Sequence, residues 1–200
     1  MKLKHFLPVL FLILNVHCYS QTFAGFGIKG GLVLASHTFA EAGSTYSRTG
    51  FEAGVLGEFF KLKLFSLITE VNFEQKGGND RFESIDHYLT VYVLSIPMLA
   101  KLTSFTGKFL PYLSVGPRID VYIGNDKTEP DKYYYQDINP VDFGITAAIG
   151  SEIQISKKIS LLAETSWSPD LTTYRSPTVT HDLIIRNISF EFRTGIKFSP

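Results

Sequence analysis

The sequence predicts an all-β protein, namely an eight-stranded antiparallel up-and-down transmembrane β-barrel. Three observations lead to this fold class. Side-chain character alternates with period two in segment after segment, and the connections between these segments alternate between long and short. From Gln21 onward, no segment has the roughly 20 apolar residues that a membrane-spanning helix needs.

The last segment, 187–198, shows the alternation most clearly. One face carries Ile188, Phe190, Phe192, Ile196 and Phe198, whereas the other carries Asn187, Ser189, Glu191, Arg193 and Lys197. Period two places such sets on opposite faces of a strand. The same split predicts strands at 50–60, 65–75, 112–123, 142–153 and 160–168. The glycine-rich segment 23–35 and the segment 88–101, which is apolar on both faces, complete a set of eight.

The connections support a membrane barrel. Long polar stretches at 36–48, 77–87, 124–141 and 169–182 alternate with short ones near 61–64, 102–108 and 156–158. Bacterial outer-membrane barrels have long extracellular loops and short periplasmic turns, so both termini are expected at the periplasmic end. Strands of about 12 residues, tilted by about 45°, span roughly 28 Å of the membrane.

Charged side chains are concentrated on one face of the strands, and we expect that face to line the lumen. A soluble lipocalin-like barrel would instead place its apolar face inside. The inverted arrangement is favoured because the apolar faces are nearly free of charge, as lipid requires. Aromatic residues near strand ends (Tyr88, Tyr112, Tyr122 and Trp167) suggest interfacial girdles. The predicted lumen charge network consists of Glu52, Glu58, Glu70, Glu74, Arg118, Asp120, Glu152, Glu164, Glu191, Arg193 and Lys197.

Residues 1–20 have the layout of a secretory signal peptide. Lys2 and Lys4 precede the apolar run 6–16, and Cys18-Tyr19-Ser20 provides a cleavage site before Gln21. We therefore expect export through the Sec pathway and a barrel domain at 21–200. Cys18 is the only cysteine, and His17 stands where an acylated cysteine is usually preceded by a small residue, which disfavours a lipoprotein.

Several motifs suggest other chemistry, and none outweighs the barrel interpretation. The glycine pattern at 25–30 resembles a dinucleotide-binding turn, but a strand continues where a helix is needed, so no cofactor is expected. His37, His87 and His181 fall in the predicted long loops and are interpreted as solvated side chains rather than metal ligands. Ser36-His37 and His181-Asp182 are the only hints of a lipid A-modifying enzyme. The 19 basic and 19 acidic residues balance, so no nucleic-acid partner is expected.

Five segments resemble the PorT-type outer-membrane β-barrel proteins of Bacteroidota. The resemblance runs from Gln21 to the end of the chain, and it is carried by 27–32, 70–77, 94–101, 111–117 and 195–198. The chain departs from the family pattern at Val33, where members often have Asn, and at Ser95, where they often have Glu. The resemblance implies an eight-stranded barrel in the outer membrane and no catalytic residues.

From these observations we expect a non-enzymatic protein of the cell outer membrane with a structural or interaction role through four long extracellular loops. Its expected partners are outer-membrane lipid, a protein or surface at those loops, and the insertion machinery, which commonly reads an aromatic residue such as Phe198 near the end of the last strand. Alternatives are a soluble lipocalin-like ligand-binding barrel, a lipid A-modifying enzyme and a narrow pore.

Overall fold

The computed structural model describes residues 23–39, 43–44, 46–82, 85–104, 107–127, 139–172, 174–176 and 183–200. The predicted signal peptide lies outside the described residues. In the part of the chain that is described, no helix is long and apolar enough to cross a membrane.

Eight long strands form the sheet. They are β1 (Phe23–Phe39), β3 (Tyr46–Phe59), β4 (Phe65–Phe82), β5 (Ile85–Thr103), β6 (Phe109–Lys127), β7 (Val141–Gln154), β8 (Ile159–Pro169) and β10 (Leu183–Phe198). Two short strands, β2 (Gly43–Ser44) and β9 (Tyr174–Ser176), pair with the ends of β1 and β10. Each long strand coincides with one of the eight predicted segments.

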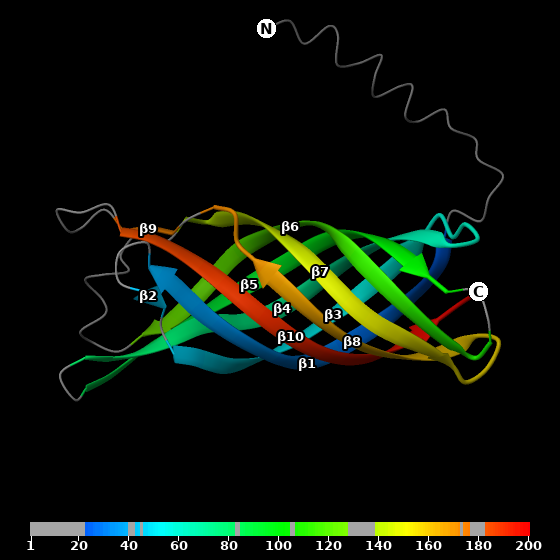
Figure 1. Ribbon diagram of the computed structural model, residues 1–200, viewed down its shortest axis with the longest axis horizontal. Coiled ribbons are helices and arrows are strands. Elements are labelled where there is room, and N and C mark those ends of the chain that lie inside the picture. The colour runs from blue at the N-terminus through cyan, green and yellow to red at the C-terminus, as the bar shows by residue number, and fades with distance from the viewer. Residues whose placement is uncertain are drawn as a thin grey trace, which may run out of the picture.

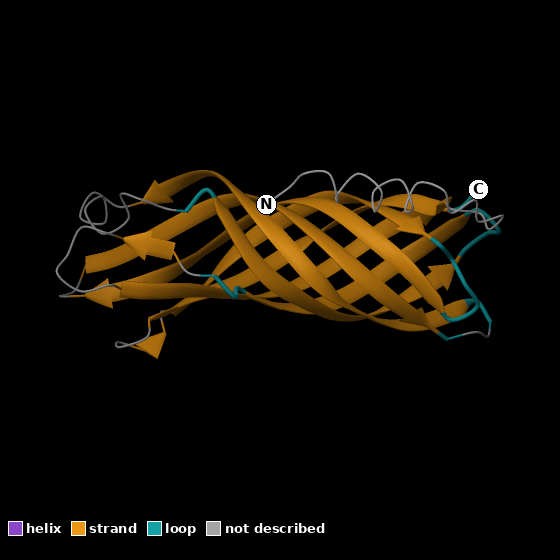
Figure 2. Cartoon of the chain, turned by 90° about the horizontal axis from the view of Figure 1, so that it is seen from above, coloured by secondary structure: helices purple, strands orange, loops and turns teal. Residues whose placement is uncertain are grey.

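The sheet closes into a barrel. Each long strand pairs antiparallel with its neighbour in the chain, and β1 pairs with β10 from Phe26↔Phe198 to Phe39↔Ile185. Figure 1 shows the tilted strands wound around one long axis, with the C-terminus at the right-hand end. Figure 2 shows the same closed wall from above, built of strands and loops. The predicted fold class, an eight-stranded antiparallel up-and-down barrel, is confirmed.

Glycines allow the first and last strands to approach closely at the seam. A Cβ atom at Gly31 of β1 would lie 2.9 Å from the Cα atom of Arg193, and one at Gly195 of β10 would lie 3.1 Å from the Cα atom of Lys29. Such contacts with backbone atoms cannot be relieved by rotating a side chain. The glycine-rich sequence of β1 therefore serves the closure of the barrel.

The strands extend further toward the long-loop end than the alternation predicts. The prediction of a long polar loop at 77–87 is wrong, because β4 and β5 stay paired from Gly77↔Thr90 to Phe82↔Ile85. Only residues 83–84 separate the two strands. Polar residues in this segment concealed the strand in the sequence, whereas its backbone pairing with the partner strand decides the structure. Pairing likewise extends β1 to Phe39 and β6 to Lys127.

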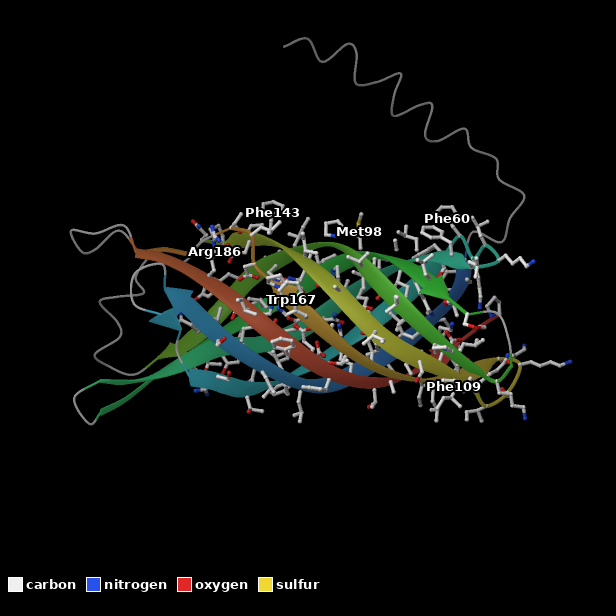
Figure 3. All side chains as sticks on the ribbon, in the orientation of Figure 1. Phe60, Met98, Phe109, Phe143, Trp167 and Arg186 are labelled. Atoms are coloured by element: carbon white, nitrogen blue, oxygen red, sulfur yellow. The ribbon has the colours of Figure 1, made fainter. Side chains whose placement is uncertain are left out.

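The outer surface of the barrel is apolar. Large hydrophobic side chains on every long strand are exposed, among them Leu32, Val55, Val71, Leu113 and Ile149. Met98 and Phe143 point away from the wall of the barrel in Figure 3. These residues alternate with buried polar ones, so the barrel has the polarity of a protein whose solvent is lipid and not water.

The close approach of β1 and β10 predicts that replacing a glycine at the seam destabilises the barrel. Gly31→Ala should lower the stability of the folded barrel by about 1–3 kcal/mol, since the added methyl group meets the backbone of β10. Urea unfolding in lipid vesicles, followed by the fluorescence of Trp167, the single tryptophan, measures this change. Gly124→Ala is the matched control because no atom lies within 4 Å of its added Cβ. Equal losses in both variants would contradict a tight seam.

Candidate functional site: the charged lumen

The inward face of the barrel is lined with charged side chains. All eleven residues of the predicted lumen charge network are buried. The structure adds Lys29, Lys76, Lys101, Asp142 and Asp170. Among the described residues, six bases and ten carboxylates are therefore buried inside. They form three clusters, named here by their position along the barrel axis.

The short-turn cluster lies nearest the end at which the chain terminates. Lys197 Nζ lies 2.7 Å from Glu58 Oε2 and 2.5 Å from Glu152 Oε1. Lys101 Nζ lies 3.0 Å from Glu152 Oε2 and 3.6 Å from Glu58 Oε1. Ser66 donates a hydrogen bond of 2.6 Å to Glu58. Two lysines and two glutamates from four strands thus form a closed, charge-balanced ring.

The middle cluster is centred on Arg193 of β10 and Lys29 of β1. Lys29 Nζ contacts Glu70 at 2.5 Å and Glu164 at 3.0 Å. The Arg193 guanidinium lies within 3.1–3.8 Å of four carboxylates, those of Glu52, Glu70, Glu164 and Glu191. Arg193 therefore connects strands on both sides of the barrel through a single planar group with five donors.

The long-loop cluster lies beyond the middle cluster, toward the end of the barrel with the long connections. Lys76 Nζ contacts Asp120 at 2.6 Å and Glu74 at 3.0 Å. Arg118 Nε lies 3.1 Å from Asp120 Oδ1, and Arg118 Nη2 pairs with Asp170 just past the end of β8. This cluster joins β4, β6 and the residue that follows β8, so it ties the barrel wall together toward the long-loop end.

An apolar layer separates the short-turn and middle clusters. Leu56, Ile68, Leu99 and Leu162 point inward from four strands and are 0–6% exposed. A small cavity beside them is also lined by Lys29, Glu58, Glu70, Lys101, Tyr112, Glu164 and Lys197. An eight-stranded barrel is only wide enough for its own side chains, and here the charged clusters and the apolar layer occupy its interior.

Tyr112 corrects the expectation of an interfacial girdle. Its side chain is 5% exposed and lies in the lumen, where its hydroxyl donates a 2.8 Å hydrogen bond to Glu164. Lys101 Nζ lies 4.5 Å from the centre of its ring. Tyr122 is also partly buried and packs against Val91 and Val93. Trp167 is 46% exposed, whereas the side chain of Tyr88 lies outside the described residues.

The sequence prediction missed three lysines, and each for a separate reason. Lys29 lies in the glycine-rich first segment, and Lys101 ends a segment whose two faces are both apolar. Lys76 lies one residue past the predicted end of its strand. A longer period-two register would have found it, because Asn72, Glu74 and Lys76 follow one another on the inward face. These three bases raise the number of positive charges that face the eight carboxylates of the predicted network from three to six.

Burial makes this network sensitive to the loss of any base. Glu52 and Glu74 lie directly opposite each other on β3 and β4, an arrangement of like charges that is destabilising by itself. Arg193 and Lys76 offset the repulsion from either side. Removing one partner of a buried ion pair leaves a charge without solvent or counter-charge, which costs more than the pair contributes in its intact form.

The hints of other chemistry add no site to the described part of the chain. Within it, no group of three or more His, Cys, Asp or Glu side chains is placed to hold a metal ion. The side chains of His37 and His87, and the segment His181-Asp182, lie outside the described residues. The glycines at 25–30 are strand residues of β1, which is the interpretation that the sequence favours over a nucleotide-binding turn.

A closed ring of tilted antiparallel strands, apolar outside and charged inside, defines a membrane-spanning β-barrel. The family described as outer membrane protein beta-barrel domain matches residues 19–172, and the chain belongs to this family. Its location is accordingly the outer membrane. This polarity is the reverse of that of a soluble lipocalin-like barrel.

Solved outer-membrane proteins share this fold. OprG from Pseudomonas aeruginosa has a TM-score of 0.54 and 11% sequence identity, with 90% of this chain and 97% of that chain covered. Neisserial surface protein A has a TM-score of 0.53 and 14% identity, with coverages of 88% and 97%. At these identities the likeness concerns the fold alone. No curated protein sequence matches the chain.

The middle cluster predicts a large effect of a single substitution. Arg193→Met should destabilise the barrel by about 3–5 kcal/mol, because four buried carboxylates lose their shared counter-charge. The urea midpoint in lipid vesicles measures the effect. Arg186→Met, at an exposed position of the same strand, is the control and should change stability by less than about 0.5 kcal/mol. A similar midpoint for both variants would show that the lumen network is not structural.

Proposed function

We propose that the protein is a non-enzymatic component of the outer membrane that acts through its extracellular end, in a structural or interaction role, and not by passing a solute through its lumen. The observation that carries this proposal is the filled interior. Three ion-pair clusters and an apolar layer occupy successive levels of an eight-stranded barrel. This leaves the outer surface and the strand ends as the surfaces on which a partner can act.

The proposal includes an orientation. In bacterial outer-membrane barrels the short turns face the periplasm, so the β3–β4, β5–β6 and β7–β8 turns would lie there. The signal peptide at 1–20, cleaved before Gln21, would direct export through the Sec pathway. Phe198, at the end of β10, would be the aromatic residue read by the insertion machinery. The long connections and the β4–β5 hairpin would then face outward.

The β4–β5 hairpin is the most extended described feature of the outward end. The two strands contain 18 and 19 residues. At about 3.3 Å per residue and a tilt of about 40°, strands of this length rise roughly 45 Å, whereas the apolar band of such barrels is about 25 Å tall. We infer that the paired strand ends, up to Phe82 and Ile85, stand clear of the lipid, where they would be accessible to partners outside the cell.

We further propose membership of the PorT-type proteins of Bacteroidota. The proposal is supported by the five segments that resemble this family, which fall on β1, β4, β5, β6 and β10. Secretion, the role from which that family takes its name, is not carried over, because no described residue of this chain points to it.

A closed lumen predicts the absence of a channel. Purified protein in planar lipid bilayers should give no steady ionic current at moderate voltage, because the lumen clusters and the apolar layer obstruct the path. A porin of 16 strands, measured in the same chamber, is the positive control. A sustained ohmic current from this protein would contradict the proposed function.

Two variants distinguish action at the outer end from transport. Replacing 79–88 with Asn-Gly keeps the register, because Gly78↔Leu89 then flanks a two-residue turn. This variant should fold yet fail to restore the phenotype of a deletion strain. Leu162→Ala, which thins the apolar layer and leaves the outer end intact, should restore it. The opposite result would favour transport. Heat-modifiable migration on gels verifies that both variants are folded.

A further inference from the structure

Charge is distributed unevenly between the two ends of the barrel. The three short turns, 60–64, 104–108 and 155–158, contain five lysines and no acidic residue. The segments at the other end, 36–48, 77–87, 124–141 and 169–182, contain ten acidic residues and five basic ones. The net charge of zero for the whole chain hides this polarity. The lysines of the short turns, here called the basic rim, are Lys61, Lys63, Lys108, Lys157 and Lys158.

Backbone hydrogen bonds hold the first and third turns of the basic rim in place. In the first turn, Leu62 donates to the carbonyl of Phe65 at 2.7 Å, and Phe60 adopts a left-handed conformation with φ of 51°. In the third turn, Ile155 and Ser156 both donate to the carbonyl of Ile159, and the Ser156 hydroxyl accepts from Lys158 at 3.2 Å. The positive charges are therefore mounted on ordered backbone.

Large apolar side chains alternate with these lysines. Phe60, Leu62 and Leu64 flank Lys61 and Lys63, and they are 44%, 59% and 48% exposed. Phe109 follows Lys108, and Ile155 precedes the lysine pair of the third turn; they are 58% and 61% exposed. Phe60 and Phe109 lie at the right-hand end of the molecule in Figure 3, on opposite sides of the barrel. The apolar outer surface thus continues into the turns themselves.

We propose that the basic rim binds the headgroups of anionic phospholipids in the periplasmic leaflet of the outer membrane. Apolar side chains at the level of the turns would enter the boundary between headgroups and acyl chains. The lysines would extend from the same turns to the phosphates on the aqueous side of that boundary. Each lysine near an anionic lipid surface adds to the attraction, and five on one rim surround the barrel. The rim would thereby recruit an anionic lipid annulus and hold the barrel at a defined depth.

Lipid fits this surface better than an aqueous partner does. A polyanion in the periplasm, such as peptidoglycan, would recognise the lysines but would leave Leu62, Leu64 and Ile155 exposed to water. A headgroup boundary accommodates both kinds of side chain. The distribution of the lysines over three separate turns also matches a lipid annulus and not a single docked molecule.

Native mass spectrometry in neutral detergent tests the proposal. The folded protein is mixed with equal amounts of phosphatidylglycerol and phosphatidylcholine of the same acyl chains, and the bound lipids are counted. We expect a preference for phosphatidylglycerol of roughly tenfold at low salt. In the rim variant, with all five rim lysines changed to Gln, it should fall to less than about twofold.

The matched control removes five positive charges from the other end. This variant carries Arg48→Gln, Arg81→Gln, Lys127→Gln, Lys132→Gln and Arg175→Gln, and it should keep the preference of the wild type. Equal loss in both variants, or no preference in the wild type, overturns the proposal. Sedimentation with peptidoglycan sacculi that depends on the rim lysines, in the absence of a lipid preference, would also overturn it.

The assignment of the basic rim to the periplasmic leaflet rests on the orientation given in the proposed function. Lipid preference in detergent does not depend on that orientation or on any role of the outer end. A failed lipid measurement therefore leaves the proposed function standing, and a failed complementation experiment leaves the lipid preference standing.

Discussion

The pairing of β1 with β10 is the interaction on which the rest of the structure depends. Lipid offers no hydrogen-bond partners, so an unpaired strand edge within the membrane would leave a row of backbone groups unsatisfied. Closure removes that edge, and glycines at the seam let the two strands approach. Once the ring is closed with eight strands, its interior is narrow, and every inward side chain must fit beside those of the other strands.

Charge inside the barrel follows from that constraint. Outward positions must be apolar, so the charged residues of the spanning strands can only point inward, where neighbouring strands supply their counter-ions. The three clusters are accordingly built between strands: Lys197 of β10 with Glu58 of β3, Arg193 of β10 with Glu70 of β4, and Lys76 of β4 with Asp120 of β6. Such contacts tie together strands far apart in the chain and also fill the space that a solute would need.

With a filled lumen, we propose that the protein acts through its two ends, and these ends differ. At one end, β4 and β5 continue as a polar hairpin past the apolar band, and at the other, short turns combine lysines with exposed leucine and phenylalanine. Both features depend on hairpin pairing, which positions residues that carry no apolar alternation. In the function that we propose, the barrel would hold one polar surface outside the membrane and the basic rim at the opposite boundary.

The sequence by itself determined the class, the number of long strands and, for six of them, which face is charged, because period two is a local property of a strand with one face toward lipid. It did not determine where the strands end or how the charges pair. The segment 77–87 has the composition of a loop, yet it is a hairpin through its partner strand. Lys29, Lys76 and Lys101 join the lumen, and Tyr112 turns inward to Glu164, through contacts between residues 41 to 135 positions apart. Only the closed tertiary structure decides those contacts, because ring closure sets the register that brings distant strands face to face.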